Sequence, residues 1–184
     1  IIRHTGCALV GQTDAIAPAD RRLYAMRDVT ATVESVPLIC ASILSKKIAE
    51  GAKALVLDVK VGRGAVMKAD ADARRLAEGL IDIAGANGVK TEALLTAMDA
   101  PLGMKVGNAT EVIEAIDTLK GQGPRGVEAL SIALTTRMVV LGGVESDPSA
   151  AEARVVAALR SGAALERFRA IVEIQGGDPH VIDD

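Results

Sequence analysis

The chain has 184 residues with 21 basic and 24 acidic side chains, a formal net charge of -3, and no basic block. This charge balance excludes nucleic acid and an anionic membrane as the expected main partner. The chain has one Tyr, one Phe and no Trp, so its core must be aliphatic. It also lacks the aromatic platforms on which single-stranded nucleic acid stacks.

The apolar runs, the first residue and the cysteines indicate where the protein is located and whether the chain is part of a longer one. No apolar run reaches the roughly 18 residues that cross a bilayer, and no signal-peptide pattern opens the sequence, so we expect a cytoplasmic protein. The chain starts at Ile1 rather than Met, which suggests a piece of a longer protein. Cys7 and Cys40 are far apart and lack the spacing of metal ligands, so reduced, buried thiols are expected.

The first quarter of the chain predicts one short strand and two helices. Residues 5–19 indicate a short strand and then a loop that ends at Pro18. Residues 19–27 carry helix formers, with Asp20 placed to favour the helix N-terminus. A second helix is predicted over about 36–50, because Ser35 suits the N-cap, Pro37 the first turn and Gly51 the position after the last turn.

The next segments predict an α/β fold. The run "AKALVLDVKVG" is typical of a strand buried on both faces. A helix over 70–86, with Leu76, Leu80 and Ile83 in phase, and a strand over 90–96 follow it. Strand, helix and strand in this order predict a right-handed parallel crossover, and thus a parallel-type sheet with flanking helices. Four more helices are predicted, at about 107–119, 125–142, 147–161 and 163–174.

This order of elements predicts a helical excursion out of an α/β domain. Residues 1–18 would enter the α/β lobe, 19–49 would form part of a small helical lobe, and 50–184 would return to the α/β lobe. A cleft between the two parts is the natural place for a ligand.

One face of the predicted 36–50 helix carries both apolar and polar side chains. Steps of three and four residues bring Ile39, Ser42 and Lys46 onto a narrow arc. With Arg27 as a further donor, this set suits a planar ring that has carbonyl oxygens beside an N–H group. The alternative is that Lys46 and Lys47 only extend to solvent at a helix end, where positive charge is favoured.

Two further patterns leave alternatives open. In "DVKVGRGAVM", the glycines after a strand could open backbone N–H groups to an anion, aided by Lys60 and Arg63, or form an ordinary turn. Glu111 and Glu114 lie in the first turns of a predicted helix, where capping and solvent exposure explain them and a cation site is the lesser option. No role is assigned to the two histidines.

Long segments of the chain resemble one enzyme family. These are "GQTDAIAPADRRLYAMRDVTATVESVPLICASILSKKIAEGAKALVLDVKVGRGAVM", "LLTAMDAPLGMKVGNATEVIEAIDTLKGQGP" and "QGGDPHVIDD". They resemble the pyrimidine-nucleoside phosphorylase and thymidine phosphorylase family over essentially the whole chain. Members are pentosyltransferases of pyrimidine salvage, in which a small helical lobe and a large α/β lobe close over the substrates. The resemblance implies a homodimer that splits uridine, thymidine or deoxyuridine with phosphate into a free base and a (deoxy)ribose 1-phosphate.

The resemblance also implies roles for individual residues. Arg27, Ser42 and Lys46 match the residues that bind the base, and Tyr24 and Ile39 match those that line its ring. Arg27 and Lys46 are thereby the expected catalytic residues, with phosphate as co-substrate and no organic cofactor. Some members also hold a monovalent cation such as potassium, and the matching positions are Leu102, Lys105 and Glu114.

Two departures from the family pattern restrict what this chain is expected to do. The family's glycine-rich phosphate loop, with its lysine, serine and accompanying histidine, lies upstream of Ile1, and family members continue beyond the final "VIDD". We therefore expect the 184-residue chain alone to be inactive.

Two other functions remain open at this point. The chain could be a structural, dimerisation or base-binding piece without turnover. It could also serve phosphoribosyl transfer, because anthranilate phosphoribosyltransferases share this fold, although "LYAMRDVTATV" favours a pyrimidine.

Overall fold

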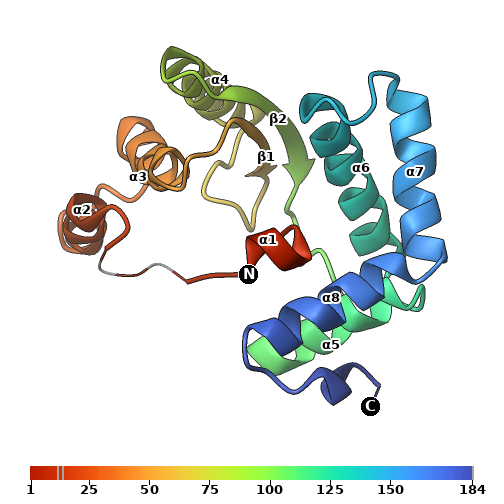
Figure 1. The fold of residues 1–184 in the computed structure, drawn as a ribbon. Coiled ribbons are helices and arrows are strands. Elements are labelled where there is room, and N and C mark those ends of the chain that lie inside the picture. The colour runs from red at the N-terminus through yellow and green to blue at the C-terminus, as the bar shows by residue number, and fades with distance from the viewer. Residues whose placement is uncertain (12, 14, 184) are drawn as a thin grey trace. The chain divides into compact units, whose positions relative to one another are not determined.

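The computed structural model describes all residues except 12, 14 and 184, and it divides into two compact units (Figure 1). The sheet unit comprises residues 12–101 and 137–146, and the helical unit comprises residues 1–11, 102–136 and 147–184. The helices expected within 19–49 fall in the same compact unit as the strands. The division into lobes at residues 18 and 49 stays a prediction.

The sheet unit contains the expected parallel strand pair. Strand β1 (Ala54–Val61) pairs with β2 (Lys90–Ala97) from Ala54↔Lys90 to Val61↔Ala97, and helix α4 (Asp70–Ala86) connects them. Parallel neighbours need such a crossover, since a tight turn cannot return the chain to the same end of the sheet. The predicted α/β class, with a small parallel sheet and flanking helices, is confirmed.

The core of the sheet unit lies between α4, β1 and helix α3 (Val36–Ala49). The buried face of α4 carries Ala73, Leu76, Ala77, Leu80 and Ala84, at spacings of three and four residues. Ile83 is 42% exposed, so its predicted place on this face is wrong. It lies one position before Ala84, and adjacent helical residues point about 100° apart.

Strand β1 is less buried than its apolar sequence predicts. Val59 is its one fully buried residue, and most of the others are half-buried. The expectation of burial on both faces is therefore wrong for the described chain. The physical reason is that faces of a sheet are covered by helices, and among the described helices α4 is the one that packs closely on the strand pair.

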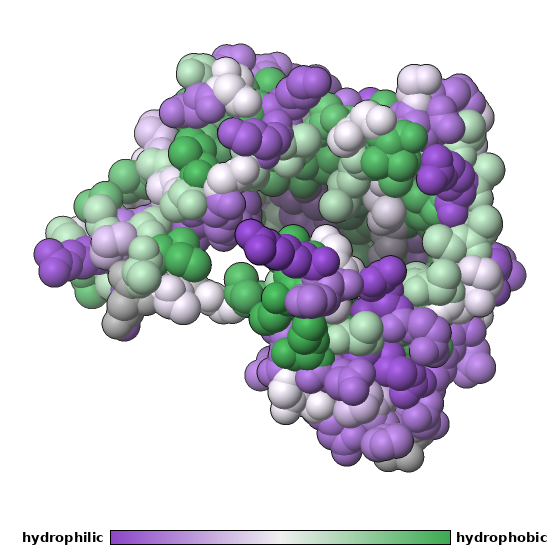
Figure 2. All heavy atoms as spheres, viewed as in Figure 1, coloured by the Kyte–Doolittle hydropathy of each residue, from purple (hydrophilic) through white to green (hydrophobic). Residues whose placement is uncertain are grey.

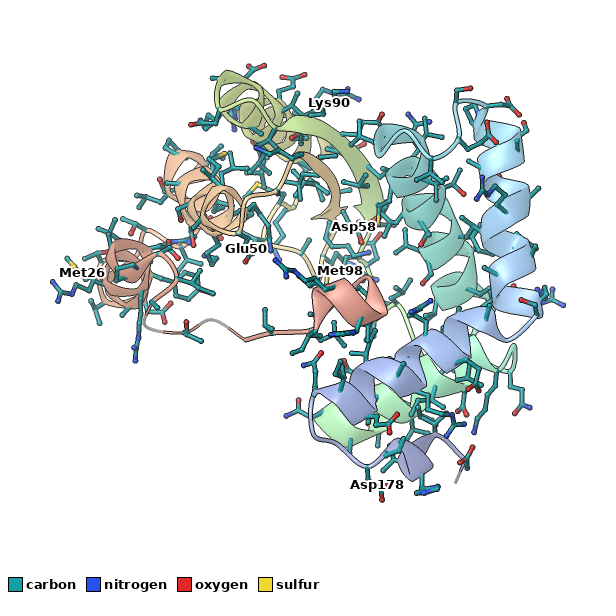
Figure 3. All side chains as sticks on the ribbon, viewed as in Figure 1. Met26, Glu50, Asp58, Lys90, Met98 and Asp178 are labelled. Atoms are coloured by element: carbon teal, nitrogen blue, oxygen red, sulfur yellow. The ribbon has the colours of Figure 1, made fainter. Side chains whose placement is uncertain are left out.

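Helix α2 (Pro18–Val29) extends the predicted 19–27 helix at both ends and contacts α3. Pro18 starts the helix, where the missing N–H group costs nothing. Leu23 and Met26 are both more than half exposed, and Figure 3 shows Met26 on the outer side of α2. This outer side of α2 packs against no described element.

The helical unit confirms the four helices predicted after residue 100. They are α5 (Asn108–Leu119), α6 (Arg125–Leu141), α7 (Pro148–Arg160) and α8 (Ala163–Ile174), and α6 continues into the sheet unit from Arg137. Figure 1 shows α8 lying beside α5, and the chain closes with a 3-10 turn, Pro179–Ile182. None of the helices in the described part of the chain is long and apolar enough to span a bilayer.

The N-terminal segment differs from its prediction. A short helix, α1 (Ile2–Thr5), opens the chain, and residues 7–10 form no strand. Instead, the Gln175 side chain bonds both backbone groups of Leu9, at 3.0 Å to the N–H and 2.6 Å to the C=O. A side-chain amide thus takes the place of the neighbouring strand that this segment lacks. Cys7 is exposed, so only Cys40 fulfils the expectation of a buried thiol.

The surface of the helical unit is uneven in polarity. Figure 2 shows a mostly hydrophilic face over α8 and the 3-10 turn, and an apolar patch at α1. The patch is formed by exposed Ile1, Ile2, Leu9 and Val10.

Candidate functional site

A cavity of about 500 Å³ lies within the sheet unit, between α2, α3 and the strand β1. Of the five residues predicted to bind a planar ring, Tyr24, Arg27, Ile39 and Ser42 line it, and Lys46 does not. The opposite wall contains Asp58 and Met98, both labelled in Figure 3, among aliphatic side chains. A mostly apolar cavity with a few polar groups is the usual character of a small-molecule site.

Arg27 is held rigidly at the edge of this cavity. Its residue is 8% exposed, its Nη2 donates to the carbonyl of Val33, and its guanidinium carbon lies 5.3 Å from the centroid of the Tyr24 ring. Both contacts fix the planar donor group, the second through a cation–π attraction. Its Nε is buried and has no hydrogen-bond partner among the described residues. A buried donor of this kind carries a free-energy cost that a ligand acceptor would remove.

Ser42 and Lys46 are brought together as their four-residue spacing predicts. The Lys46 Nζ donates to the Ser42 Oγ at 3.0 Å and to the Asp20 Oδ2 at 2.6 Å. Lys46 therefore does not merely extend to solvent, whereas Lys47 does pair with Glu50 at the surface. The structure thus contradicts the simple helix-end alternative for Lys46, and its role in ligand binding stays a prediction.

The sequence interpretation missed the contact between Asp20 and Lys46. Asp20 was assigned only to the N-terminus of its helix, yet its side chain is buried and paired with Lys46. A signal was present in the sequence. Asp20 precedes Arg27 by seven residues, and two helical turns return nearly to the same face.

The glycine-bearing turn after β1 has no open cradle for an anion. The N–H groups of Gly62, Arg63 and Gly64 donate to the Met67 carbonyl, the Asp99 carboxylate and the Met98 carbonyl. Lys60 lies 2.7 Å from Asp58 and also donates to Thr96. The side chain of Arg63 is largely exposed. The structure therefore supports the ordinary-turn interpretation.

Glu114 differs from the expectation of solvent exposure. Its side chain on α5 is buried, and its Oε1 accepts from the backbone N–H groups of Met104 and Lys105. Glu111 does behave as expected, since it is exposed and accepts from the Gly107 N–H. Glu114 thus connects α5 to the preceding loop. That loop contains Leu102 and Lys105, the other two positions predicted to bind a monovalent cation.

The donor set of this loop fits a hard cation in part. Carboxylate and carbonyl oxygens are the ligands that such ions prefer, and Glu114 with the backbone carbonyls of Leu102 and Lys105 would be the ligands of the predicted ion. The ammonium of Lys105 turns to Asp117 at 3.3 Å, so it is engaged elsewhere. Among the described residues, no group of three or more His, Cys, Asp or Glu side chains could hold a metal ion.

Comparisons with known proteins identify the family of the chain and two relatives. A family model described as glycosyl transferase family, a/b domain, matches residues 1–165. The chain is 49% identical over 183 residues to the pyrimidine-nucleoside phosphorylases of Staphylococcus aureus strains USA300 and bovine RF122 / ET3-1. Each alignment covers 100% of this chain and 42% of the relative. The chain therefore spans less than half the length of these relatives.

Proposed function

The chain belongs to the glycosyl transferase family that has this a/b domain, and from this premise we propose that it forms the pyrimidine-binding part of a pyrimidine-nucleoside phosphorylase. The reaction is the cleavage of uridine, thymidine or deoxyuridine by inorganic phosphate, which yields the free base and a ribose or deoxyribose 1-phosphate. The observation that carries the proposal is the cavity on whose wall Arg27, with an unpartnered buried N–H group, and Ser42 both lie.

The polar groups of the cavity suit the edge of uracil or thymine. That edge presents an N–H group between two carbonyl oxygens. The guanidinium of Arg27 only donates, so it suits a carbonyl, and the Ser42 hydroxyl can donate and accept. Ile39 and Tyr24 offer apolar surface to the face of the ring. Lys46 contributes a second cation next to Ser42 rather than on the cavity wall itself.

The same groups can favour the transition state over the bound substrate. When the glycosidic bond breaks, electron density moves onto the pyrimidine and the sugar becomes cationic. Donors held in place before the reaction bind the developing anion more tightly than the neutral base, which lowers the barrier. Phosphate is the nucleophile, so the reaction needs no covalent enzyme residue and no organic cofactor.

We extend the proposal to a potassium ion and a homodimer. The carboxylate of Glu114 and the carbonyls of Leu102 and Lys105 would supply part of the ion's oxygen ligands. Thermal unfolding of the complete gene product in potassium chloride and in tetramethylammonium chloride tests the ion. If the unfolding temperature is higher in potassium, and if Glu114→Gln removes this increase, the site is supported. Equal unfolding temperatures contradict it.

Sedimentation velocity of the complete gene product at micromolar concentration tests the dimer. A mass of two chains supports the homodimer, and a mass of one chain contradicts it.

A base-binding piece without turnover is the second candidate for the 184-residue chain itself. It is favoured by the observation that the chain spans 42% of its phosphorylase relatives. The two candidates differ in one measurement, the phosphate-dependent release of uracil from uridine by this chain alone. Release would show turnover, whereas uracil binding without release supports the second candidate.

The main test compares three forms of the complete gene product. We expect the wild type to cleave uridine or thymidine only when phosphate is present, and Lys46→Ala to lose most of that activity. Lys47→Ala is the matched control, because it removes the next lysine of the same helix, one that pairs at the surface with Glu50. A folded wild type that is inert on both nucleosides would contradict the proposed function.

A further inference from the structure

We propose that Asp20 is a positioning residue of the pyrimidine site, which acts through Lys46 to orient the hydroxyl of Ser42. The proposal rests on the function proposed above and adds a residue and a chain of contacts to it. It concerns three side chains from two helices, Asp20 on α2 and the pair Ser42 and Lys46 on α3.

The contacts form a continuous line from a buried carboxylate to the cavity wall. The Oδ2 of Asp20 lies 2.6 Å from the Nζ of Lys46, which lies 3.0 Å from the Oγ of Ser42. The side chain of Asp20 is 7% exposed and that of Lys46 is 24% exposed. Ser42 lines the cavity, whereas Asp20 and Lys46 do not. Asp20 can therefore reach a ligand only through the other two residues.

The direction of these hydrogen bonds determines what Ser42 can offer. An ammonium group only donates, so the Ser42 Oγ is the acceptor of the bond from Lys46. The hydroxyl proton of Ser42 is then free to point into the cavity toward a carbonyl oxygen. The remaining lone pair of Oγ is free to accept from a ring N–H group.

The hydroxyl proton of a serine inside a helix has a competing partner, so the position of Oγ must be held if that proton is to reach the cavity. Such a hydroxyl commonly donates to the backbone carbonyl four residues earlier, which for Ser42 is that of Leu38. That bond would direct the proton back along the helix, away from a ligand. Lys46 alone is a poor restraint because its four-carbon side chain is flexible, and Asp20 supplies the fixed anchor.

The location of the ion pair distinguishes it from an ordinary surface pair. A carboxylate buried away from water is unfavourable unless a charge and hydrogen bonds compensate it. The neighbouring pair of Lys47 and Glu50, at the C-terminal end of the same helix, has side chains that are 40% and 37% exposed. The buried pair of Asp20 and Lys46 can therefore be compared with the solvent-exposed pair of Lys47 and Glu50.

The first experiment measures uracil binding and uridine phosphorolysis by the complete gene product with Asp20→Asn. We expect uracil affinity to fall about tenfold, the size of one lost charge-assisted hydrogen bond. The value of kcat should fall more than KM rises, because the hydrogen bond from Ser42 to the base, supported by the nearby charge of Lys46, strengthens as the base becomes anionic. Asp20→Glu keeps the carboxylate and should recover part of both losses, whereas Glu50→Gln should change neither.

A double variant tests whether Asp20 acts by positioning Lys46 and Ser42 or only by holding α2 against α3. In a Lys46→Met background, Asp20→Asn removes the second charge of the pair and leaves no buried ion uncompensated. If Asp20 acts through Lys46, adding Asp20→Asn to this background changes uracil affinity no further. An additive loss, or wild-type affinity and kcat in Asp20→Asn, would overturn the inference. If uracil does not bind to the folded wild type, the proposed function itself fails, which is a separate outcome.

Discussion

The backbone N–H group of Met104 lies 2.8 Å from the Oε1 of Glu114, a buried carboxylate ten residues further along the chain. The same oxygen also accepts from the Lys105 N–H at 3.1 Å. The Glu114 carboxylate is buried and needs hydrogen-bond donors, so its bonds from two backbone N–H groups hold that part of the loop in place. The loop before α5 is therefore built around one side chain.

This arrangement predicts a large effect of the substitution Gly103→Ala. A Cβ atom at Gly103 would lie 1.6 Å from the Oε2 of Glu114, so the carboxylate must move and its two hydrogen bonds weaken. We expect the free energy of unfolding to fall by about 1–3 kcal/mol. Urea denaturation monitored by circular dichroism measures this change.

Gly85→Ala is the matched control for that substitution. Gly85 lies in α4, and a Cβ there meets no atom within 4 Å. Alanine should raise the free energy of unfolding by about 0.5–1 kcal/mol through its higher helix propensity. Equal effects of the two alanines would contradict the close packing of Glu114 against Gly103.

Leu80 and Ile83 give a second test, directed at the core of the sheet unit. Leu80 is 1% exposed and Ile83 is 42% exposed, although both are aliphatic residues of α4. Leu80→Ala should lower the free energy of unfolding by about 2–5 kcal/mol, since it leaves a cavity. Ile83→Ala should cost less than about 1 kcal/mol. Chemical denaturation of both variants checks the assignment, and a larger loss for Ile83→Ala would contradict it.

The helices and strands of the chain could mostly be predicted from its sequence. Local signals suffice where they agree, as at Ser35, Pro37 and Gly51 around α3, or in the three- and four-residue spacing of α4. The strand predicted around residues 7–10 is wrong, because an apolar stretch forms a strand only if a partner strand exists. Here the partner is the side chain of Gln175, which no local pattern indicates.

Four of the five residues predicted for the candidate site line the cavity, but the hydrogen-bond network around them could not be predicted from the sequence. Helical spacing places Ser42 beside Lys46, and the structure adds a hydrogen bond between them. The burial of Asp20 depends on how α2 packs against α3, and spacing within one helix does not report packing between two. The same limit applies to Glu114, which looked exposed because its burial depends on the fold of the preceding loop.

The two cysteines should differ sharply in reactivity. Burial raises the pKa of the Cys40 thiol above its usual range, while Cys7 is exposed. Because the thiolate is the reactive form, a thiol reagent such as DTNB should modify Cys7 rapidly at pH 8 and Cys40 only upon unfolding. Cys7→Ser should abolish the fast phase and Cys40→Ser should leave it unchanged. A fast phase that persists in Cys7→Ser would contradict the burial of Cys40.

The pair of Arg169 and Asp183 predicts a dependence of stability on pH. Hydrogen bonding from Arg169 lowers the pKa of the Asp183 carboxyl below its usual range, and His180 adds a smaller effect in the same direction. A carboxyl with a lowered pKa in the folded state stabilises the fold above its unfolded pKa, which is about 4. This stabilisation disappears as the pH falls through the lower folded-state pKa.

The substitution Asp183→Asn tests that dependence. At pH 7 its thermal midpoint should lie below that of the wild type, and the difference should shrink as the pH falls below about 4. The effect should also weaken in high salt, because the Arg169 and Asp183 pair is partly exposed and therefore screened by ions. Glu152→Gln, which removes a negative charge from an exposed residue on α7 of the same unit, serves as a control for the loss of one negative charge. A difference between wild type and Asp183→Asn that grows toward acid pH would contradict the assignment.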